Sequence, residues 1–324
     1  MLWREDVEEA KKWIAKLRRE TSLLEELRPK ASKLWRRRDS WSKPGFEHRF
    51  VAGDGSLATR VTSYRFFYLA RAIALSNDRE SRKSKFEVLP KSEGPPQQLK
   101  GVDDLEKHAK AMMSLLEVET ISSLAEAEFP LLLFDGSLGT FLLPSSTIAP
   151  SIRRERNSLL YKLYHESSFT AFISKHSSLN LYQQHAEELE ELRGYIPDNA
   201  LFSTMPAGYS IPLRLTAGEI YGIGDLHGPW RSEVVTVFCA RLTPSAPILR
   251  IEALGDLSDT ELEKLLGAIY SISSNGYPSP LREAHLKVKL REDELEALLK
   301  TLKLDIEPTG REVLGYYGGS RIRI

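Results

Sequence analysis

The sequence contains very little cysteine. Cys239 is the single cysteine among 324 residues, so no disulfide can form within the chain. One thiol in a chain of this length is typical of a reducing, intracellular compartment. Cys239 ends the apolar run that begins at Val234, and we interpret it as a small buried hydrophobic residue.

The chain also lacks net charge, long apolar runs and a recognisable secretory signal. Lys+Arg and Asp+Glu number 45 each, so an overall basic surface is excluded as the basis of nucleic-acid binding. No apolar run approaches the ~20 residues that a membrane-spanning helix needs. The charged segment from Met1 to Arg19 has no apolar stretch with a cleavage site. We therefore expect a cytoplasmic protein without membrane association.

Two copies of the tripeptide Asp-Gly-Ser, at Asp54 and at Asp135, each follow an apolar stretch. The wholly apolar run before Asp135 predicts a strand that is buried on both faces of a sheet. A single Asp-Gly is usually only a turn. Two aspartates at the ends of adjacent strands would converge, however, and they would repel each other unless a cation neutralises them. Oxygen ligands favour Mg²⁺ or Mn²⁺, so the pair predicts a metal site.

A third carboxylate is expected from the helix predicted over residues 103–126. At about 100° per residue, Glu119 falls between the directions of Met112, Leu115 and Leu116, and it is predicted to point inward. Glu117 is predicted to point largely outward. An inward glutamate needs a partner, which is either a metal ion or a buried arginine. Carboxylates arranged in this way would hold two cations for phosphodiester hydrolysis.

Two other groups are candidates for the same chemistry. His285 is a candidate for proton transfer, metal binding or contact with the scissile phosphate, and Tyr277 for orienting water or phosphate. Their alternative role is structural. Arg36, Arg37 and Arg38 stand between two tryptophans, in a pattern that suits a phosphate backbone and stacked bases. The alternative for them is a solvated helical face with core tryptophans.

The remaining patterns predict a mixed α/β chain with a helical N-terminal segment over residues 1–45 and a larger domain over 46–324. Residues 76–100 contain Gly94-Pro95-Pro96 and are predicted to be a loop or insertion. A helical insertion is predicted at about 151–195. Further helices are predicted over 1–41 with a break at Pro29, 151–176, 181–192, 259–273 and 292–302. Strands are predicted near 50–54 and over 61–75, 129–134, 219–223, 234–242 and 248–253.

These segments, taken in order, resemble the NurA nuclease family over most of the chain. The resemblance rests on Val51-Ala52-Gly53-Asp54-Gly55-Ser56, on Leu116-Glu117-Val118-Glu119 followed by Leu132–Leu138, and on Tyr277-Pro278-x-Pro-Leu281-x-x-Ala284-His285. It implies an RNase H-like core, in which a mixed β-sheet is flanked by helices, with N-terminal and C-terminal helical additions. It also implies a Mn²⁺-dependent deoxyribonuclease, with Mg²⁺ as the alternative ion, that has 5′→3′ exonuclease and single-strand endonuclease activity.

The resemblance also assigns site residues and partners. The metal ligands it implies are Asp54, Glu119 and Asp135, with Glu117 as the alternative glutamate and with Tyr277 and His285 in support. Lys175 is implied to contact a phosphate. The family forms homodimers that dock on the hexameric ring ATPase HerA. We therefore expect a role in DNA end resection during double-strand break repair by homologous recombination, linked to the archaeal recombination nuclease complex.

Two other functions are considered. Gly224-Asp225-Leu226-His227-Gly228 resembles the first box of calcineurin-like metallophosphoesterases, and Gly255–Asp259 echoes the second. The later Gly-Asn-His-Glu box is missing, because no asparagine in the chain is followed by histidine. The other alternative is an inactive RNase H-like module that only binds DNA or an ATPase. The presence of all the expected acidic residues argues against it.

Overall fold

The computed structural model describes residues 4–41, 49–62, 65–90, 102–125, 131–143, 150–189, 195–222 and 229–304. The chain divides into two compact units, each built from two separate segments. We call residues 49–170 and 279–324 the β2 unit, and residues 1–48 and 171–278 the β9 unit. Within the described part of the chain, no helix combines the length and the apolar character that crossing a membrane requires.

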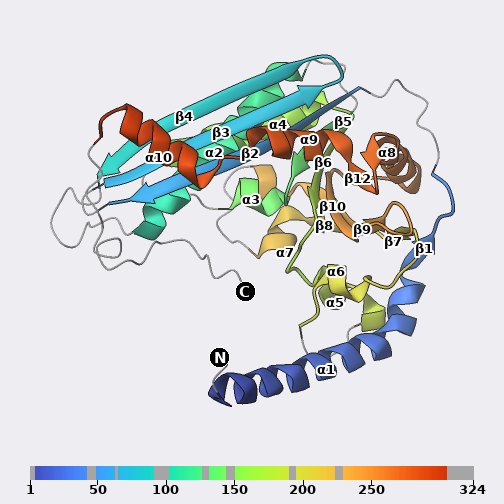
Figure 1. Cartoon of the computed structure of the whole chain (residues 1–324). Helices are drawn as coiled ribbons and strands as arrows, with labels where there is room; N and C mark the ends of the chain where they lie inside the picture. Colours follow the sequence, from blue (N-terminus) through green and yellow to red (C-terminus); the bar gives the residue numbers. More distant parts are fainter. Residues whose placement is uncertain are drawn as a thin grey trace. The chain divides into compact units, whose positions relative to one another are not determined.

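The β2 unit contains a mixed sheet. Long strands β2, β3 and β4 run antiparallel to one another, and β2 also pairs in parallel with the short strand β5 (Figure 1). The strands are β2 (Phe50–Val61), β3 (Arg65–Ser76), β4 (Glu80–Pro90) and β5 (Leu131–Asp135). Because β5 pairs only with the first part of β2, from Phe50 to Gly53, the rest of β2 extends past the end of β5.

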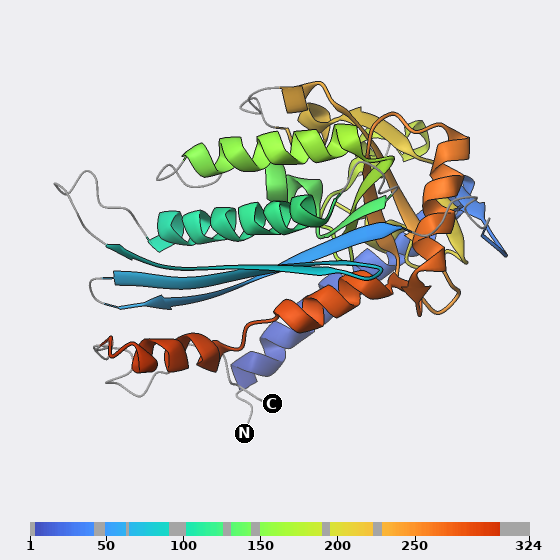
Figure 2. The same cartoon turned by 90° about the horizontal axis from the view of Figure 1, so that it is seen from above.

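Helices cover both faces of this sheet, as Figure 2 shows from above. One face carries α2 (Val102–Leu124), with α3 (Leu138–Leu142) and α4 (Pro150–Glu166) packed against α2, and the other carries α9 (Ser279–Val288) and α10 (Glu292–Thr301). Strand β3 explains the arrangement, because alternate apolar residues point to opposite faces. Tyr68 and Ala70 pack with α2, whereas Phe67 and Leu69 pack with α10. The predicted sheet with flanking helices is confirmed.

The β9 unit is built on antiparallel strands in the order β1-β7-β9-β10-β6, with β8 also paired to β9. Its core includes Leu27 from the long N-terminal helix, together with Tyr182 and Phe202. The strands are β1 (Trp35–Arg37), β6 (Phe169–Ser174), β7 (Gly208–Ser210), β8 (Leu213–Thr216), β9 (Val234–Arg241) and β10 (Leu249–Leu254). The other elements are α1 (Arg4–Lys33), α5 (Leu181–His185), a 3-10 helix (Glu187–Leu189), α6 (Asp198–Leu201), α7 (Ala217–Tyr221), a second 3-10 helix (Pro229–Arg231), α8 (Asp259–Ser271) and the hairpin of β11 (Ser273–Ser274) and β12 (Tyr277–Pro278).

Several predicted elements differ from the structure. Residues 80–90 form strand β4 and not a loop, because the tight connection from Ser76 to Arg79 returns the chain along β3. The helix predicted to reach residue 176 ends at Glu166, and the β-branched and aromatic residues that follow form β6. The strand predicted at 219–223 is wrong, because Thr216 caps helix α7 there. Helix α1 continues through Pro29, where a break was predicted.

Candidate metal centre

Asp54 and Asp135 extend from neighbouring parallel strands. The register pairs Gly53 of β2 with Phe134 of β5, so Asp54 and Asp135 occupy the next position on each strand. Side chains at matching positions of paired strands point to the same face of a sheet. Asp54 is directly opposite Ile73 of β3, which lies in the cluster that packs against α9. The two carboxylates therefore face α9 at the point where β5 ends.

Helix α9 brings His285 to this point. Ala284 and Val288 pack on Ile73 and Leu75 of the sheet, which fixes the rotation of the helix. The neighbouring residue, His285, then directs its ring toward β2, where Nδ1 lies 2.8 Å from Oδ2 of Asp54. The His285 side chain is 51% exposed, whereas that of Asp54 is 11% exposed. The imidazole thus connects a buried carboxylate to solvent.

The three side chains meet the geometric requirement of a cation site. Each of Asp54, Asp135 and His285 offers one ligand atom, and these three atoms lie within 4.8 Å of one another. Burial and the nearby charge of Asp135 raise the pKa of the Asp54 carboxyl above its usual range, while His285 acts in the opposite direction. A divalent cation would remove this repulsion. Carboxylate oxygens are ligands that both Mg²⁺ and Mn²⁺ accept, so the cluster suits a divalent cation.

Glu117 of α2 supplies a third acidic group from the other face of the sheet. Its side chain is buried, and no described residue forms a hydrogen bond with Oε1. Burial, followed by the charges of Asp54 and Asp135, raises its pKa well above the usual range. A Cβ atom on Gly55 would lie 3.1 Å from Oε2 of Glu117. The glycine after Asp54 therefore makes room for this carboxylate beside β2.

The predicted orientations of Glu117 and Glu119 were wrong. Glu119 is partly exposed, and its Oε2 lies 2.6 Å from Nζ of Lys83 on β4. The prediction failed because α2 is buried on two sides, against the sheet and against α4, so the stripe of Met112, Leu115 and Leu116 did not define a single inward direction. The glycines on either side of Asp54 were the available signal, because small residues on a strand allow a helix to approach closely.

Tyr277 and Lys175 belong to the β9 unit and contact each other. The Nζ atom of Lys175 lies 4.3 Å from the centre of the Tyr277 ring, a cation–π contact. Tyr277 starts strand β12, and Lys175 follows strand β6. Their contact with phosphate or water stays a prediction.

The three consecutive arginines lie at a strand, not on the predicted helix. Arg36 and Arg37 belong to β1, and each guanidinium has an acidic partner in the β9 unit. The pairs are Arg36 with Asp259 (2.9 Å), Arg37 with Asp39 (3.1 Å) and Arg38 with Glu263. Arg36 and Arg38 also lie over the ring of Tyr209. Their charge is therefore balanced locally, and DNA binding by this segment stays a prediction.

The metallophosphoesterase boxes gain no support from the described residues. Residues 223–228, which contain the first box, lie outside the described part of the chain. In the second, Ser258 caps helix α8: its hydroxyl accepts a hydrogen bond from the backbone N–H of Glu261, and the Glu261 side chain accepts one from the backbone of Ser258. This capping box explains the segment without a ligand.

Comparisons with known proteins agree with the geometry. The family model described as "NurA domain" matches residues 48–290. A protein from Methanocaldococcus jannaschii, named a probable DNA double-strand break repair nuclease NurA, is 25% identical over 162 residues, which are 44% of this chain and 38% of that protein. The chain thus matches well under half of that relative's length.

Two solved structures share the fold. The crystal structure of the NurA nuclease from Sulfolobus solfataricus matches with a TM-score of 0.71 at 17% identity, covering 93% of this chain and 97% of that one. A crystal structure of NurA bound to dAMP and manganese matches with a TM-score of 0.66 at 13% identity, covering 97% of this chain and 100% of that one.

Proposed function

Because the chain belongs to the NurA family, we propose that it is a metal-dependent DNA nuclease of double-strand break repair. The observation that carries the proposal is the convergence of Asp54, Asp135 and His285 within 4.8 Å of one another, next to the buried carboxyl group of Glu117. We propose these four residues as the active centre and Mn²⁺ as its ion. The manganese-bound NurA structure, which shares this fold, supports that choice of ion.

The chain's own residues have separable roles in this centre. A bound divalent ion would acidify a water molecule and stabilise charge on the phosphate. Asp54 and Asp135 would bind the ion on the face of the sheet that packs against α9, and Glu117 adds negative charge from the opposite face. In the tautomer with the proton on Nδ1, His285 donates a hydrogen bond to Oδ2 of Asp54, and Nε2 is then available to accept a proton and, once protonated, to donate to a phosphate oxygen.

The finer parts of the proposal rest on the family resemblance. They are 5′→3′ exonuclease and single-strand endonuclease activity, a cytoplasmic homodimer, and docking on a HerA-type hexameric ATPase that supplies DNA for end resection. Tyr277, Lys175 and the three arginines at residues 36–38 are proposed DNA contacts. A net charge of zero is compatible with this assembly, because an enzyme supplied with DNA by a motor needs little free affinity for it.

Cleavage of linear DNA tests the proposal directly. Purified protein is expected to degrade DNA with Mn²⁺ and not with EDTA. Asp54→Asn and Asp135→Asn should each lower the rate by on the order of 100-fold or more, because each removes a charged ligand but keeps the side-chain shape. Asp78→Asn, on an exposed turn of the same unit, is the matched control. Cleavage at the wild-type rate by either ligand variant would refute the assigned centre.

A further inference from the structure

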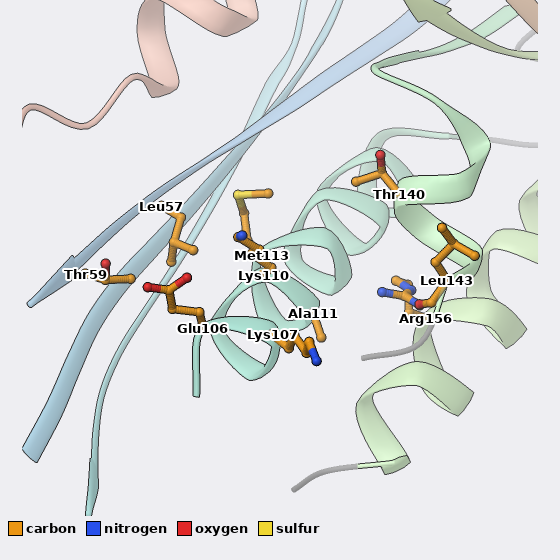
Figure 3. Close-up of a pocket in the computed structure, with 10 residues that line it drawn as sticks. All are labelled: Leu57, Thr59, Glu106, Lys107, Lys110, Ala111, Met113, Thr140, Leu143 and Arg156. Atoms are coloured by element: carbon orange, nitrogen blue, oxygen red, sulfur yellow. The ribbon is translucent and has the colours of Figure 1, made fainter. Parts of the chain in front are cut away.

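The β2 unit contains a pocket of about 520 Å³ whose lining residues are not part of the proposed metal centre. This volume is within the usual range of small-molecule sites. Its apolar wall includes Leu57, Met113 and Leu143, and its charged wall includes Lys107, Lys110 and Arg156. In Figure 3, Arg156 and Leu143 lie at one end, Leu57 and Thr59 lie at the other, and α2 lies between them.

Arg156 is a buried cation without an acidic partner among the described residues. Only 1% of the residue is exposed. Its guanidinium donates to neutral groups, the hydroxyl of Ser114 at 2.8 Å and the carbonyl of Leu143 at 3.4 Å. Burial and the nearby charge of Arg153 lower its pKa to about 10. A buried charge without a counter-charge is costly, so an anion at the pocket would stabilise this arrangement.

Two lysines increase the positive charge at the same pocket. Lys107 and Lys110 lie one turn apart on α2, both are exposed, and neither forms an ion pair within the described part of the chain. Glu106 is the acidic residue among the pocket-lining side chains. Three cations against one carboxylate, beside an apolar wall, suit a ligand that has both a phosphate and an apolar ring. A nucleotide has this chemistry.

Strand β2 connects the pocket to the metal centre. Leu57 and Thr59 lie three and five residues beyond Asp54 on β2, about 10 and 17 Å at the usual rise of a strand. Leu57 and Thr59 alternate with Asp54 and are on the α2 face of the strand, past the end of β5.

We propose that this pocket binds a phosphorylated nucleotide unit. If the proposed nuclease function holds, the unit is part of the strand being cut. Lys107, Lys110 and Arg156 neutralise the phosphate, and Leu57, Met113 and Leu143 contact the base or sugar. The phosphate belongs either to a DNA strand, at its 5′ end or inside it, or to a free mononucleotide.

Binding in EDTA tests the pocket without cleavage. The full chain is titrated with a labelled single-stranded oligonucleotide, with and without a 5′-phosphate, and followed by fluorescence anisotropy. Because Arg156 is buried and its substitution would endanger the fold, the test variant is Lys107→Gln/Lys110→Gln. We expect about tenfold weaker binding, and a slope of log K against log salt that is shallower by about 1.4, from two lost phosphate contacts.

The control variant Lys162→Gln/Lys300→Gln removes the same charge from two exposed helical lysines of the β2 unit that do not line the pocket. It should bind within about twofold of wild type. If the test variant loses more affinity for the 5′-phosphorylated oligonucleotide than for the unphosphorylated one, the pocket binds a terminal phosphate. If it loses affinity for both oligonucleotides equally, the pocket binds an internal phosphate. Displacement of the strand by a deoxynucleoside monophosphate, reduced in the test variant, identifies a free nucleotide.

Equal binding by wild type and both variants, or equal loss in both variants, would overturn the pocket assignment. Failure of the proposed function is distinguishable, because it appears as an absence of Mn²⁺-dependent cleavage by the wild type. In that case the pocket variant would still show its selective loss of nucleotide binding.

Discussion

Glu117 and Glu119 lie two residues apart on α2, in different environments. Glu117→Gln should lower the rate of Mn²⁺-dependent cleavage by about 100-fold or more, because an amide cannot supply the charge that a cation requires. Glu119→Gln loses only the partly exposed ion pair with Lys83, so cleavage should stay within about twofold and stability should fall by about 0–1 kcal/mol.

The measurements for this pair are cleavage rates and Mn²⁺ titration by calorimetry. Both variants are expected to fold, because Gln has the shape of Glu and each replacement keeps the helix propensity of its position. An active Glu117→Gln together with an inactive Glu119→Gln would reverse the assignment of the glutamate.

Asp198 makes the stability of the β9 unit depend on pH. Its buried carboxylate accepts hydrogen bonds from the backbone N–H groups of Leu181 and Tyr182, at 3.1 Å each. Burial raises its pKa to about 6 from 3.8, against the opposing effects of these hydrogen bonds and of Arg250. The folded chain therefore binds more protons than the unfolded chain between about pH 4 and pH 6. Stability contributed by this group is lost as pH rises through that window.

Asp198→Asn should remove this dependence, because an amide does not titrate. The free energy of unfolding of wild type minus that of Asp198→Asn should decrease by on the order of 2–3 kcal/mol between pH 4 and pH 6, and then stay constant. Urea denaturation at intervals between pH 4 and pH 7 measures it. Asp78→Asn, at an exposed turn, is the control. A difference that rises with pH would contradict the assigned direction.

At the scale of elements, the close approach of α2 to β2 depends on glycine. A Cβ on Gly55 would lie 3.0 Å from Cγ of Met113 and 3.1 Å from Oε2 of Glu117, whereas a Cβ on Gly53 would lie 2.6 Å from the side chain of Ile121. Gly55→Ala should therefore displace Glu117 and lower the cleavage rate by at least about tenfold. Gly53→Ala should mainly lower stability, by about 1–3 kcal/mol from overpacking.

Cleavage rates and thermal unfolding of the two glycine variants separate these effects. A Gly55→Ala variant that unfolds at a much lower temperature but cleaves normally once folded would show that Gly55 serves packing alone. A small loss of stability in Gly53→Ala would show that Ile121 and α2 can shift away from the strand, and a large loss would show that they cannot.

The sequence predicted those elements whose pattern reflects a single buried face or strict burial on both faces. Strand β5 is apolar up to Asp135, and β9 and β10 are buried along nearly their whole length; all three were predicted, as was α8 with its cap at Ser258. Strand β4 was missed because it is polar and has an exposed face. Its hydrogen-bonded pairing with β3 stabilises it as a strand, which its composition does not indicate. Helix α7 was predicted to be a strand because its five residues are too short to show a helical period.

The candidate site was predictable to a similar extent. Asp54 and Asp135 were found because each ends an apolar strand, and parallel pairing at Gly53 and Phe134 brings their side chains together. His285 was a candidate from its motif, but its contact with Asp54 depends on the rotation of α9, which packing on Ile73 and Leu75 sets. The inward direction of Glu117 could not be deduced from periodicity, because α2 has apolar neighbours on two sides.

At the scale of the whole molecule, α1 carries exposed apolar side chains that suit the proposed homodimer. Val7 and Ile14 are 41% and 48% exposed and lie seven residues apart on one face, with Trp13 beside them at 54%. We expect light scattering at micromolar concentration to give twice the 36.7 kDa chain mass. Ile14→Glu should shift the protein toward monomer, because it places a charge in an apolar contact.

Glu25→Gln, at an exposed position of the same helix, is the control for this prediction and should leave the mass unchanged. A wild-type mass of one chain would contradict the dimer, and an unchanged mass for Ile14→Glu would place the interface elsewhere.

The hydrogen bond between His285 and Asp54 joins residues that are 231 positions apart. At the usual pace of translation, about 5–20 residues per second, the ribosome adds His285 roughly 10–45 s after Asp54. A growing chain can therefore form β2, β3 and β4 early, while the histidine that completes the centre is not yet made. If the centre acts as proposed, a nascent or prematurely terminated chain lacks nuclease activity, and the cell's DNA is not exposed to a half-made enzyme.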